Sequence, residues 1–186
     1  MLTVNFTPFP KLTTERLCLR QLTPADAPAL FELRADPRVM KFIPRPPAQS
    51  VADAVAYIGV VNECASKNER LTWGIALRAD ASQVIGTIGY VSFQLEHHRG
   101  TIGYMLHPNF QGKGMMSEAV AAILDYGFDV LNLHSIEAIV DPQNVASAQV
   151  LKRSGFVQEG HFKENEFWDG KYLDTLYFSL LRPGKH

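Results

Sequence analysis

The segment Gln111-Gly112-Lys113-Gly114-Met115-Met116-Ser117-Glu118 constrains the fold more than any other part of the chain. It lies between a strand-like run at residues 101–106 and a long amphipathic run at residues 119–131, so its glycines fall where a strand ends and a helix begins. Glycine lets the backbone approach a ligand closely, and the unpaired N–H groups and the dipole of a first helical turn attract anions. The segment therefore predicts either a phosphate-binding loop or a helix start that requires a flexible backbone.

The length and charge of the chain limit its class. With 186 residues, of which 46% are hydrophobic, the chain is long enough to bury one core, and we expect a single domain over residues 1–186. The formal net charge of −1 argues against a general nucleic-acid-binding surface, which needs clustered lysine and arginine. A specific contact with RNA or a ribosome stays open.

Two observations bear on the location of the protein. Cys18 and Cys64 lie in unrelated segments, which favours reduced thiols of a cytoplasmic protein and leaves a bridge between them open. Residues 1–10 lack a basic start followed by an apolar run, and no apolar stretch reaches the roughly 18 residues that a membrane span needs. We therefore expect a cytoplasmic protein without a membrane segment.

The first third of the chain has the pattern of a strand followed by helices. Thr23-Pro24-Ala25-Asp26 provides an N-cap, a proline at the first helical position and an acidic first turn, and Ser50 is the cap of a further helix. Pro44, Pro46 and Pro47 end regular structure between these helices. The expected elements are a strand at residues 15–22, a helix at 23–34, a helical turn at 36–42 and a helix at 50–67.

The remainder of the chain has two patterns. Three runs rich in β-branched and aromatic residues, separated by short polar turns, predict an antiparallel meander with strands at residues 71–77, 84–93 and 99–106. Helices at residues 115–131 and 146–154 then alternate with strands at 135–140, 156–163 and 172–181. Asp169-Gly170 is typical of a hairpin turn between the last two strands. The chain is expected to form a mixed α/β fold.

Four motifs in order along the chain carry a resemblance to a known family. They are Gly103-Tyr104, the loop Gln111 to Gly114, Asp141-Pro142-Gln143-Asn144-Val145-Ala146-Ser147, and Leu151-Lys152-Arg153-Ser154-Gly155-Phe156. Together they resemble the Gcn5-related N-acetyltransferases (GNAT), and more closely the RimJ/RimL-like branch of ribosomal-protein acetyltransferases. The resemblance covers residues 13–181, which we take as the core of the domain.

The resemblance implies a fold and a cofactor. The family has a mixed, mostly antiparallel central sheet flanked by helices, whose fourth and fifth strands splay apart and hold acetyl-CoA in the gap. In relatives, backbone N–H groups of the glycine loop hold the CoA pyrophosphate, and the strand before the loop pairs with the pantetheine arm and offers an N–H to the thioester oxygen. The implied cofactor-binding residues are Tyr104, Met105, Leu106, Gln111, Gly112, Lys113, Gly114, Met115, Met116 and Asn144.

Two positions depart from the broad family pattern. Met116 stands where glycine or alanine is usual, although large residues also occur there in the RimJ/RimL-like branch. Leu151 stands seven residues after Asn144, where many of these acetyltransferases carry a tyrosine that acts as general acid. Leucine has no proton to give, so any hydrogen bond to the thiolate leaving group must come from elsewhere in this chain.

The resemblance also suggests catalytic residues. RimL-like enzymes are thought to use a serine at the position of Ser147, in the first turn of its helix, where a hydroxyl and a helix N-terminus both stabilise a thiolate. The structural alternative is that Ser147 only caps or packs that turn. Glu166 matches a glutamate proposed as the base; the alternatives are a solvated charge on the hairpin and Glu164 as the base. Asn144 is expected to bind the pantetheine arm, to cap the helix, or both.

The acceptor is expected to be an amine. At pH 7.5 an α-amine with a pKa of about 7.8 is roughly one-third neutral, whereas a lysine amine with a pKa of about 10.4 is neutral about 0.1% of the time. A protein N-terminus, such as that of a ribosomal protein, therefore needs little assistance and is our first expectation. By analogy with relatives, the acceptor site should include Phe42, Arg45, Phe167 and Trp168, for which core packing is the alternative role of the aromatics.

Several alternative interpretations remain open. The acceptor is alternatively a polyamine, an amino acid or an aminoglycoside, and Leu151 also fits a catalytically weak CoA-binding sensor. A dinucleotide-binding oxidoreductase requires a third glycine near Ser117 and no meander before the loop, so we disfavour it. We expect no metal, because His97 and His98 lie in a turn without further ligands at metal-binding spacing. A homodimer stays open.

Overall fold

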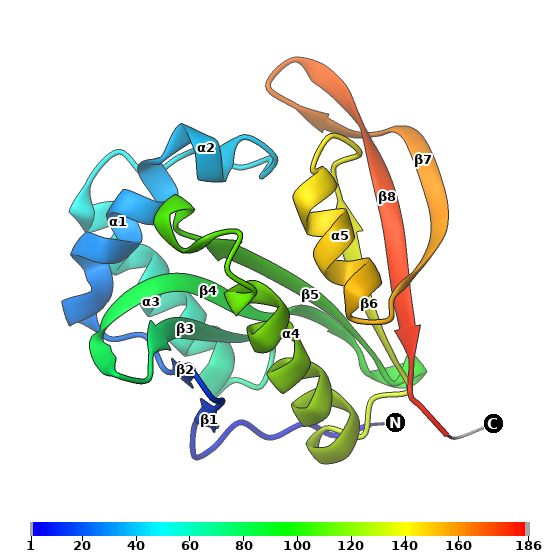
Figure 1. Ribbon diagram of the computed structural model, residues 1–186, viewed down its shortest axis with the longest axis horizontal. Coiled ribbons are helices and arrows are strands. Elements are labelled where there is room, and N and C mark those ends of the chain that lie inside the picture. Colours follow the sequence, from blue (N-terminus) through cyan, green and yellow to red (C-terminus); the bar gives the residue numbers. More distant parts are fainter. Residues whose placement is uncertain (1, 185–186) are drawn as a thin grey trace.

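The computed structural model describes residues 2–184 and shows a twisted sheet with helices on both faces (Figure 1). The strands are β1 (Leu12–Thr13), β2 (Leu17–Arg20), β3 (Leu71–Leu77), β4 (Asp80–Gln94), β5 (Arg99–Leu106), β6 (Ser135–Val140), β7 (Val157–Trp168) and β8 (Lys171–Leu181). The α-helices are α1 (Ala27–Ala35), α2 (Pro37–Met40), α3 (Val51–Ser66), α4 (Met115–Asp125) and α5 (Val145–Arg153). These elements confirm the expected mixed α/β class.

The order of the strands across the sheet is β1-β2-β3-β4-β5-β6-β8-β7. Strands β5 and β6 are parallel, and each of the other neighbouring pairs is antiparallel. The β5–β6 pairing starts at Arg99 opposite Ser135 and ends at Ile102 opposite Ala138. Beyond this point each strand follows its other neighbour: β5 pairs with β4 as far as Leu106, and β6 pairs with β8 as far as Val140. The expected splay between two central strands is therefore confirmed.

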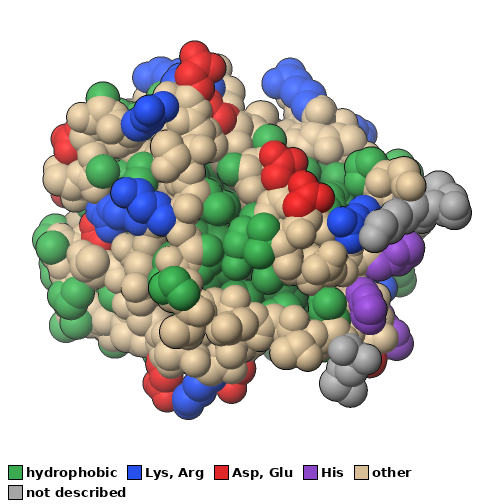
Figure 2. Space-filling view, turned by 90° about the horizontal axis from the view of Figure 1, so that it is seen from below, with side chains coloured by type: hydrophobic (Ala, Val, Ile, Leu, Met, Phe, Trp, Pro, Cys, Tyr) green, Lys and Arg blue, Asp and Glu red, His purple; other side chains and the backbone are tan. Residues whose placement is uncertain are grey.

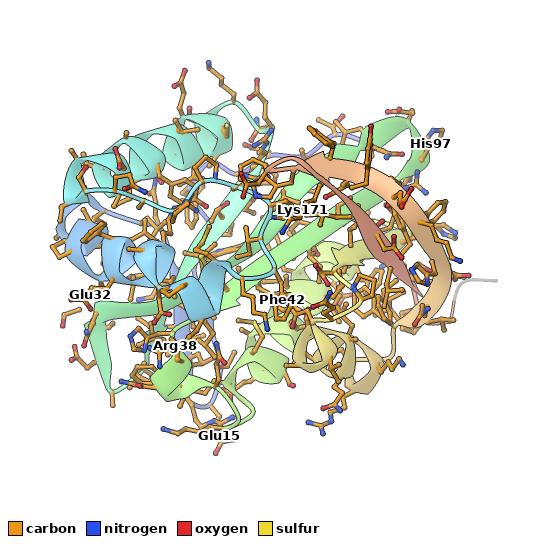
Figure 3. All side chains as sticks on the ribbon, turned by 90° about the horizontal axis from the view of Figure 1, so that it is seen from above. Glu15, Glu32, Arg38, Phe42, His97 and Lys171 are labelled. Atoms are coloured by element: carbon orange, nitrogen blue, oxygen red, sulfur yellow. The ribbon has the colours of Figure 1, made fainter. Side chains whose placement is uncertain are left out.

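Two groups of buried side chains fill the opposite faces of the sheet. On one face, α1 and α3 pack on β4 and β5 through a cluster that includes Leu30, Ile58 and Val84. On the other face, α4 packs through Val120 and Ile123. The view from above shows α3 and α4 on opposite sides of the strands (Figure 3). Side chains of β5 consequently alternate between the two clusters, and the tip of the strand is held on both faces.

The amphipathic run after the glycine loop forms α4 and then a π-helical turn at Tyr126–Val130, where we expected one continuous helix to residue 131. The hydroxyl of Tyr90 donates a hydrogen bond of 2.6 Å to the carbonyl oxygen of Ile123. A Cβ at Gly127 would lie 1.9 Å from that hydroxyl, so only glycine leaves room for it. The tyrosine thus occupies a carbonyl that a regular helix would use for its own ladder, which accounts for the wider turn.

The last hairpin is longer than expected, because β7 continues to Trp168 where we expected its end near residue 163. The expected turn at Asp169-Gly170 is confirmed, with φ angles of 47° and 76°. Figure 1 shows β7 and β8 curving over the sheet toward α2. The hairpin therefore forms one wall of the space beyond the splay.

The face seen from below carries both acidic and basic side chains (Figure 2). Hydrophobic side chains gather in the middle of this face, with acidic and basic side chains around them. Among the helices of residues 2–184, none is both long and apolar enough to cross a membrane.

A buried ion pair fixes the corner between β2 and α1. Both carboxylate oxygens of Asp26, which is 2% exposed, accept hydrogen bonds from Arg20, at 2.7 and 2.8 Å, and the backbone N–H of Thr23 donates to the same carboxylate at 2.7 Å. Burial by itself would raise the pKa of Asp26, but these hydrogen bonds outweigh it and hold the pKa below its usual value.

We predict that Asp26→Asn lowers the free energy of unfolding by about 3 kcal/mol, because it leaves Arg20 without its charged partner. The lowered folded-state pKa means that the stabilisation is complete above the unfolded value of about 3.9 and is lost as the pH falls through the folded-state pKa. Denaturant unfolding between pH 7 and pH 2 measures both effects. The control Glu63→Gln removes an exposed helical pair with Lys67 and should change stability little; equal losses in the two variants would contradict the prediction.

Candidate active site

The glycine loop joins the free end of β5 to the N-terminus of α4. Gly112 and Gly114 have φ angles of +72° and +76°, and Gly114 is the N-cap of α4 without a capping side chain. The first-turn N–H groups of a helix lack acceptors within the helix, so here they are left for a ligand. The side-chain amide of Gln111 donates a 2.8 Å hydrogen bond to the carbonyl oxygen of Leu106, which fixes the loop to the strand that it follows.

An ion pair that the sequence analysis did not single out holds the other side of this loop. Glu118, in the first turn of α4, accepts hydrogen bonds from Arg16 Nε at 2.6 Å, from the Arg16 backbone N–H at 2.8 Å and from Thr14 Oγ1 at 2.5 Å. Arg16 Nη1 also donates to the carbonyl oxygen of Lys113 at 2.9 Å. Burial would raise the pKa of Glu118, but the Thr14 and Arg16 hydrogen bonds lower it below its usual value.

Arg16 therefore fixes the loop conformation from the start of β2. A Cβ at Gly114 would lie 3.5 Å from its Nη2 atom, which places the guanidinium beside the N-terminus of α4. The sequence alone does not predict this role. An arginine before a strand and a glutamate in a first helical turn are both common, and the two residues are separated by 102 residues.

The two methionines of the loop differ in their environment. Met116 is 8% exposed and belongs to the core cluster under α4, whereas Met115 is partly buried at its edge. The large side chain at Met116 therefore points into the core, and its backbone N–H lies in the first turn of α4, where N–H groups have no acceptor within the helix. This orientation explains how the chain accommodates methionine where the broad family pattern has glycine or alanine.

Across the splay, α5 presents Ser147 to the tip of β5. The side-chain oxygen of Asn144 accepts a 3.1 Å hydrogen bond from the backbone N–H of Ser147, so Asn144 is the N-cap of α5. The hydroxyl oxygen of Ser147 lies 2.9 Å from the hydroxyl oxygen of Tyr104, and both side chains are half-buried. Capping is thus a role of Asn144, and the structure adds a hydroxyl partner for Ser147 that comes from β5.

Leu151 lies on the same helix and is fully buried. Its side chain belongs to the core under α4, together with Phe156 and Phe178. The position that carries a tyrosine in many relatives therefore supplies packing in this chain. At the splay, the hydroxyl groups of Ser147 and Tyr104 are in contact with each other.

A cavity of about 670 Å³ lies between the segment after α2, the end of β6 and the last hairpin. It brings together four residues that were expected to be near the acceptor, namely Phe42, Arg45, Glu166 and Trp168. Figure 3 shows Phe42 at the end of α2 and Lys171 on the hairpin, both toward the middle of the view from above. The lining is charged with both signs: Lys41, Arg45 and Lys171 are basic, and Asp141, Glu166, Asp169 and Asp174 are acidic.

Phe167 does not line this cavity, contrary to our expectation for the acceptor site. It is 63% exposed, and its ring packs on that of its cross-strand partner Tyr172, with centroids 5.0 Å apart. Successive residues of a strand face opposite sides, so Glu166 and Trp168 share the cavity face while Phe167 lies on the other face. Strand alternation alone therefore separates Phe167 from Glu166 and Trp168.

A bulge in β7 shapes the hairpin next to the cavity. Phe162 pairs with Thr175 and Glu166 with Leu173, so residues 163–165 all lie opposite Asp174. Asp174 accepts hydrogen bonds from the backbone N–H of Glu164 at 2.9 Å and contacts His161 Nε2 at 2.7 Å. These contacts, with the backbone N–H first, lower the pKa of Asp174. The exposed Glu164 is thus held by its backbone, and its side chain is absent from the lining of the cavity.

The histidines at positions 97 and 98 lie away from both sites. Figure 3 shows His97 at the right-hand edge of the molecule, away from Phe42 near the middle of the view. His98 adopts a left-handed conformation with φ of 52° in the turn between β4 and β5. Within residues 2–184, no group of three histidine, cysteine or acidic side chains is arranged to hold a metal ion.

Comparisons with known proteins agree with this geometry. Residues 16–157 match the family model of the acetyltransferase (GNAT) domain. The uncharacterised N-acetyltransferase p20 of Bacillus licheniformis is 37% identical over 171 residues, which cover 92% of this chain and 96% of the relative. The ribosomal protein uS5-alanine N-acetyltransferase of Escherichia coli is 29% identical over 180 residues, which cover 93% of this chain and 91% of the relative.

Solved structures share the fold. The ribosomal-protein acetyltransferase RimL in complex with coenzyme A superposes with a TM-score of 0.84, covering 95% of this chain and all of that chain, at 19% identity. A likeness at this identity shows only that the two proteins share the fold, that is, the arrangement of strands and helices described above.

The chain belongs to the GNAT acetyltransferases, and its similarity to the uS5-alanine N-acetyltransferase supports the RimJ/RimL-like branch. It is an N-acetyltransferase, and the acetyl donor of the family is acetyl-CoA. The residues fit this cofactor at two places: the backbone edge of β5 is unpaired toward β6 after Ile102, and the Gly114 N-cap leaves the first turn of α4 uncapped by a side chain.

We predict that Gly114→Glu abolishes measurable CoA binding, because it places a side chain and a negative charge at the N-terminus of α4. The matched control is Gly170→Glu, since Gly170 has the same φ of +76° and open space around its Cα atom. Titration calorimetry with CoA should give near wild-type affinity for the control. Full CoA affinity in the Gly114 variant would rule out the assigned role of the loop.

Proposed function

We propose that the protein transfers the acetyl group of acetyl-CoA to the α-amine at the N-terminus of a protein or peptide. The observation that carries this proposal is the lining of the cavity, in which acidic and basic side chains surround Phe42 and Trp168. Carboxylates favour a cationic amine, while the basic groups disfavour a polycation and suit the carbonyl groups of a peptide. By its name, the uS5-alanine N-acetyltransferase relative acetylates an alanine of a ribosomal protein, which supports a protein acceptor.

The donor side of the site consists of β5, the glycine loop and the start of α5. When bound, acetyl-CoA supplies the acetyl thioester. The backbone N–H groups of the unpaired β5 edge are suited to hold the pantetheine arm as an added strand and to donate to the thioester oxygen. Ser147, at the N-terminus of α5, donates its hydroxyl hydrogen to the sulfur as the leaving group becomes negative.

The acceptor side uses Glu166 as the base. Glu166 is half-buried, lines the cavity and is paired opposite Leu173, which also lines it. An α-amine with a pKa of about 7.8 requires only a weak base at neutral pH, and a carboxylate that accepts the amine proton fulfils this requirement. The rigid segment Pro44 to Pro47 forms the opposite wall and limits how an acceptor approaches.

We predict that Ser147→Ala lowers kcat by about tenfold to a hundredfold, because the thiolate then lacks a hydroxyl donor. The affinity for CoA at pH 7, where the thiol is neutral, should stay within about threefold of wild type, since the pyrophosphate site is separate. Steady-state kinetics and calorimetry on one preparation measure the two quantities. Unchanged kcat at saturating substrates would remove Ser147 from the mechanism.

The two candidate bases can be separated by a pair of variants. Glu166→Gln should lower kcat by about a hundredfold, with the loss largest at low pH where the amine is protonated. Glu164→Gln should leave kcat close to wild type, because that side chain does not line the cavity. The pH profile of kcat for each variant decides the assignment, and a larger loss in the Glu164 variant would reverse it.

An acceptor screen tests the proposed function itself. Acetyl-CoA is offered with peptides that have free N-termini, the same peptides with blocked N-termini and a free lysine, polyamines and aminoglycosides, and released thiol is recorded. We expect turnover with free N-termini and little with blocked ones. Faster turnover of a polyamine or an aminoglycoside would show that the acceptor is a small-molecule amine and not a protein N-terminus. The absence of turnover with any amine would favour a CoA-binding sensor.

A further inference from the structure

We propose that Tyr104 is a positioning residue for Ser147: its phenol hydroxyl donates a hydrogen bond to Ser147 Oγ and leaves the serine hydrogen directed at the CoA sulfur. This inference rests on the role of Ser147 in the proposed function and identifies the group that orients it.

The contact spans the point where the sheet opens. Tyr104 lies two residues beyond Ile102, the last residue of β5 that pairs with β6, and its backbone pairs with Ile88 of β4. Its ring packs at the edge of the core under α4, and its hydroxyl oxygen lies 2.9 Å from Ser147 Oγ and 3.4 Å from the Ser147 carbonyl oxygen. A side chain rooted in a rigid strand thus reaches the first turn of α5.

The direction of the hydrogen bond follows from the acceptors present. A serine hydroxyl has one hydrogen and two lone pairs. When a thiolate faces Ser147, the serine gives its hydrogen to this charged acceptor, because charge-assisted hydrogen bonds are the stronger ones. The lone pairs of Ser147 Oγ then accept from Tyr104, and the Tyr104–Ser147–sulfur chain polarises in one direction.

The raised pKa of Tyr104 fits an orienting role better than the role of an acid. Burial raises the pKa of Tyr104 to about 12, with the Ser147 contact opposing the shift. A CoA thiol with a pKa of about 8.5 is a stronger acid by more than about three orders of magnitude. A phenol of this acidity is a poor proton donor to the thiolate, so the contribution of Tyr104 is a fixed hydrogen bond from the strand to the serine.

The test compares the affinities of CoA and desulfo-CoA by calorimetry, at pH 7 where the thiol is neutral and at about pH 9.5 where a free thiol is largely ionised. The ratio of the two dissociation constants isolates the sulfur and does not depend on turnover. In wild type, CoA should gain affinity relative to desulfo-CoA at the higher pH: the ratio of the desulfo-CoA dissociation constant to the CoA dissociation constant should rise about tenfold. The reason is that the thiolate accepts a hydrogen bond from Ser147. Tyr104→Phe should reduce this gain to about threefold or less while leaving desulfo-CoA affinity unchanged.

Three further variants complete the experiment. Tyr177→Phe removes a hydroxyl from β8, outside the β5–α5 contact, and should keep the wild-type gain. Ser147→Ala should abolish the gain, and adding Tyr104→Phe to it should change neither the gain nor kcat further, because the tyrosine acts through the serine. A wild-type gain in Tyr104→Phe, or additive losses in the double variant, would overturn the inference while Ser147 keeps its role. A wild-type gain in Ser147→Ala would overturn the role of Ser147 and this inference with it, whereas the acceptor screen would still decide the acceptor class.

Discussion

Backbone hydrogen bonding between β5 and β6 ends at the pair Ile102 and Ala138, and the active site depends on this ending. Each strand keeps its other, antiparallel partner beyond that point, so the right-handed twist of the sheet carries the two halves apart. Backbone groups that a continuous sheet would consume are thereby left on the edge of β5. A cofactor with amide groups along its length can satisfy them, which is why an unpaired edge in the middle of a sheet is tolerated.

In the mechanism that we propose, the two halves of the sheet carry different parts of the reaction. β5 leads through the glycine loop into α4, where Arg16 and Glu118 hold the loop in place, and this half is the proposed donor site. β6 leads into α5 and pairs with the hairpin that carries Glu166, so the other half provides Ser147 and the wall of the acceptor cavity. The Tyr104–Ser147 contact joins the halves at their open end. Donor and acceptor can accordingly approach from separate sides and meet between the strands.

Local signals in the sequence predicted most elements, because caps, prolines and alternation act over a few residues. The loop at Gly114 and the cap at Asn144 were predicted from such local signals. Contacts between distant segments were not predictable in this way: Arg16 with Glu118 and Tyr104 with Ser147 require the fold. The position of Phe167 was predictable from strand alternation, but it was assigned to the acceptor site by analogy with relatives. The bulge opposite Asp174 has no simple sequence signal, since its residues are ordinary for a strand end.

The central claim is that the parted strands hold acetyl-CoA along β5 and the glycine loop, and backbone amide hydrogen exchange tests it most directly. Exchange is measured by mass spectrometry with and without acetyl-CoA. The account predicts slower exchange in residues 103–116 and at the start of α5, with little change in the segment at residues 40–47 of the acceptor cavity. Protection confined to that segment, with unchanged exchange in residues 103–116, would contradict it.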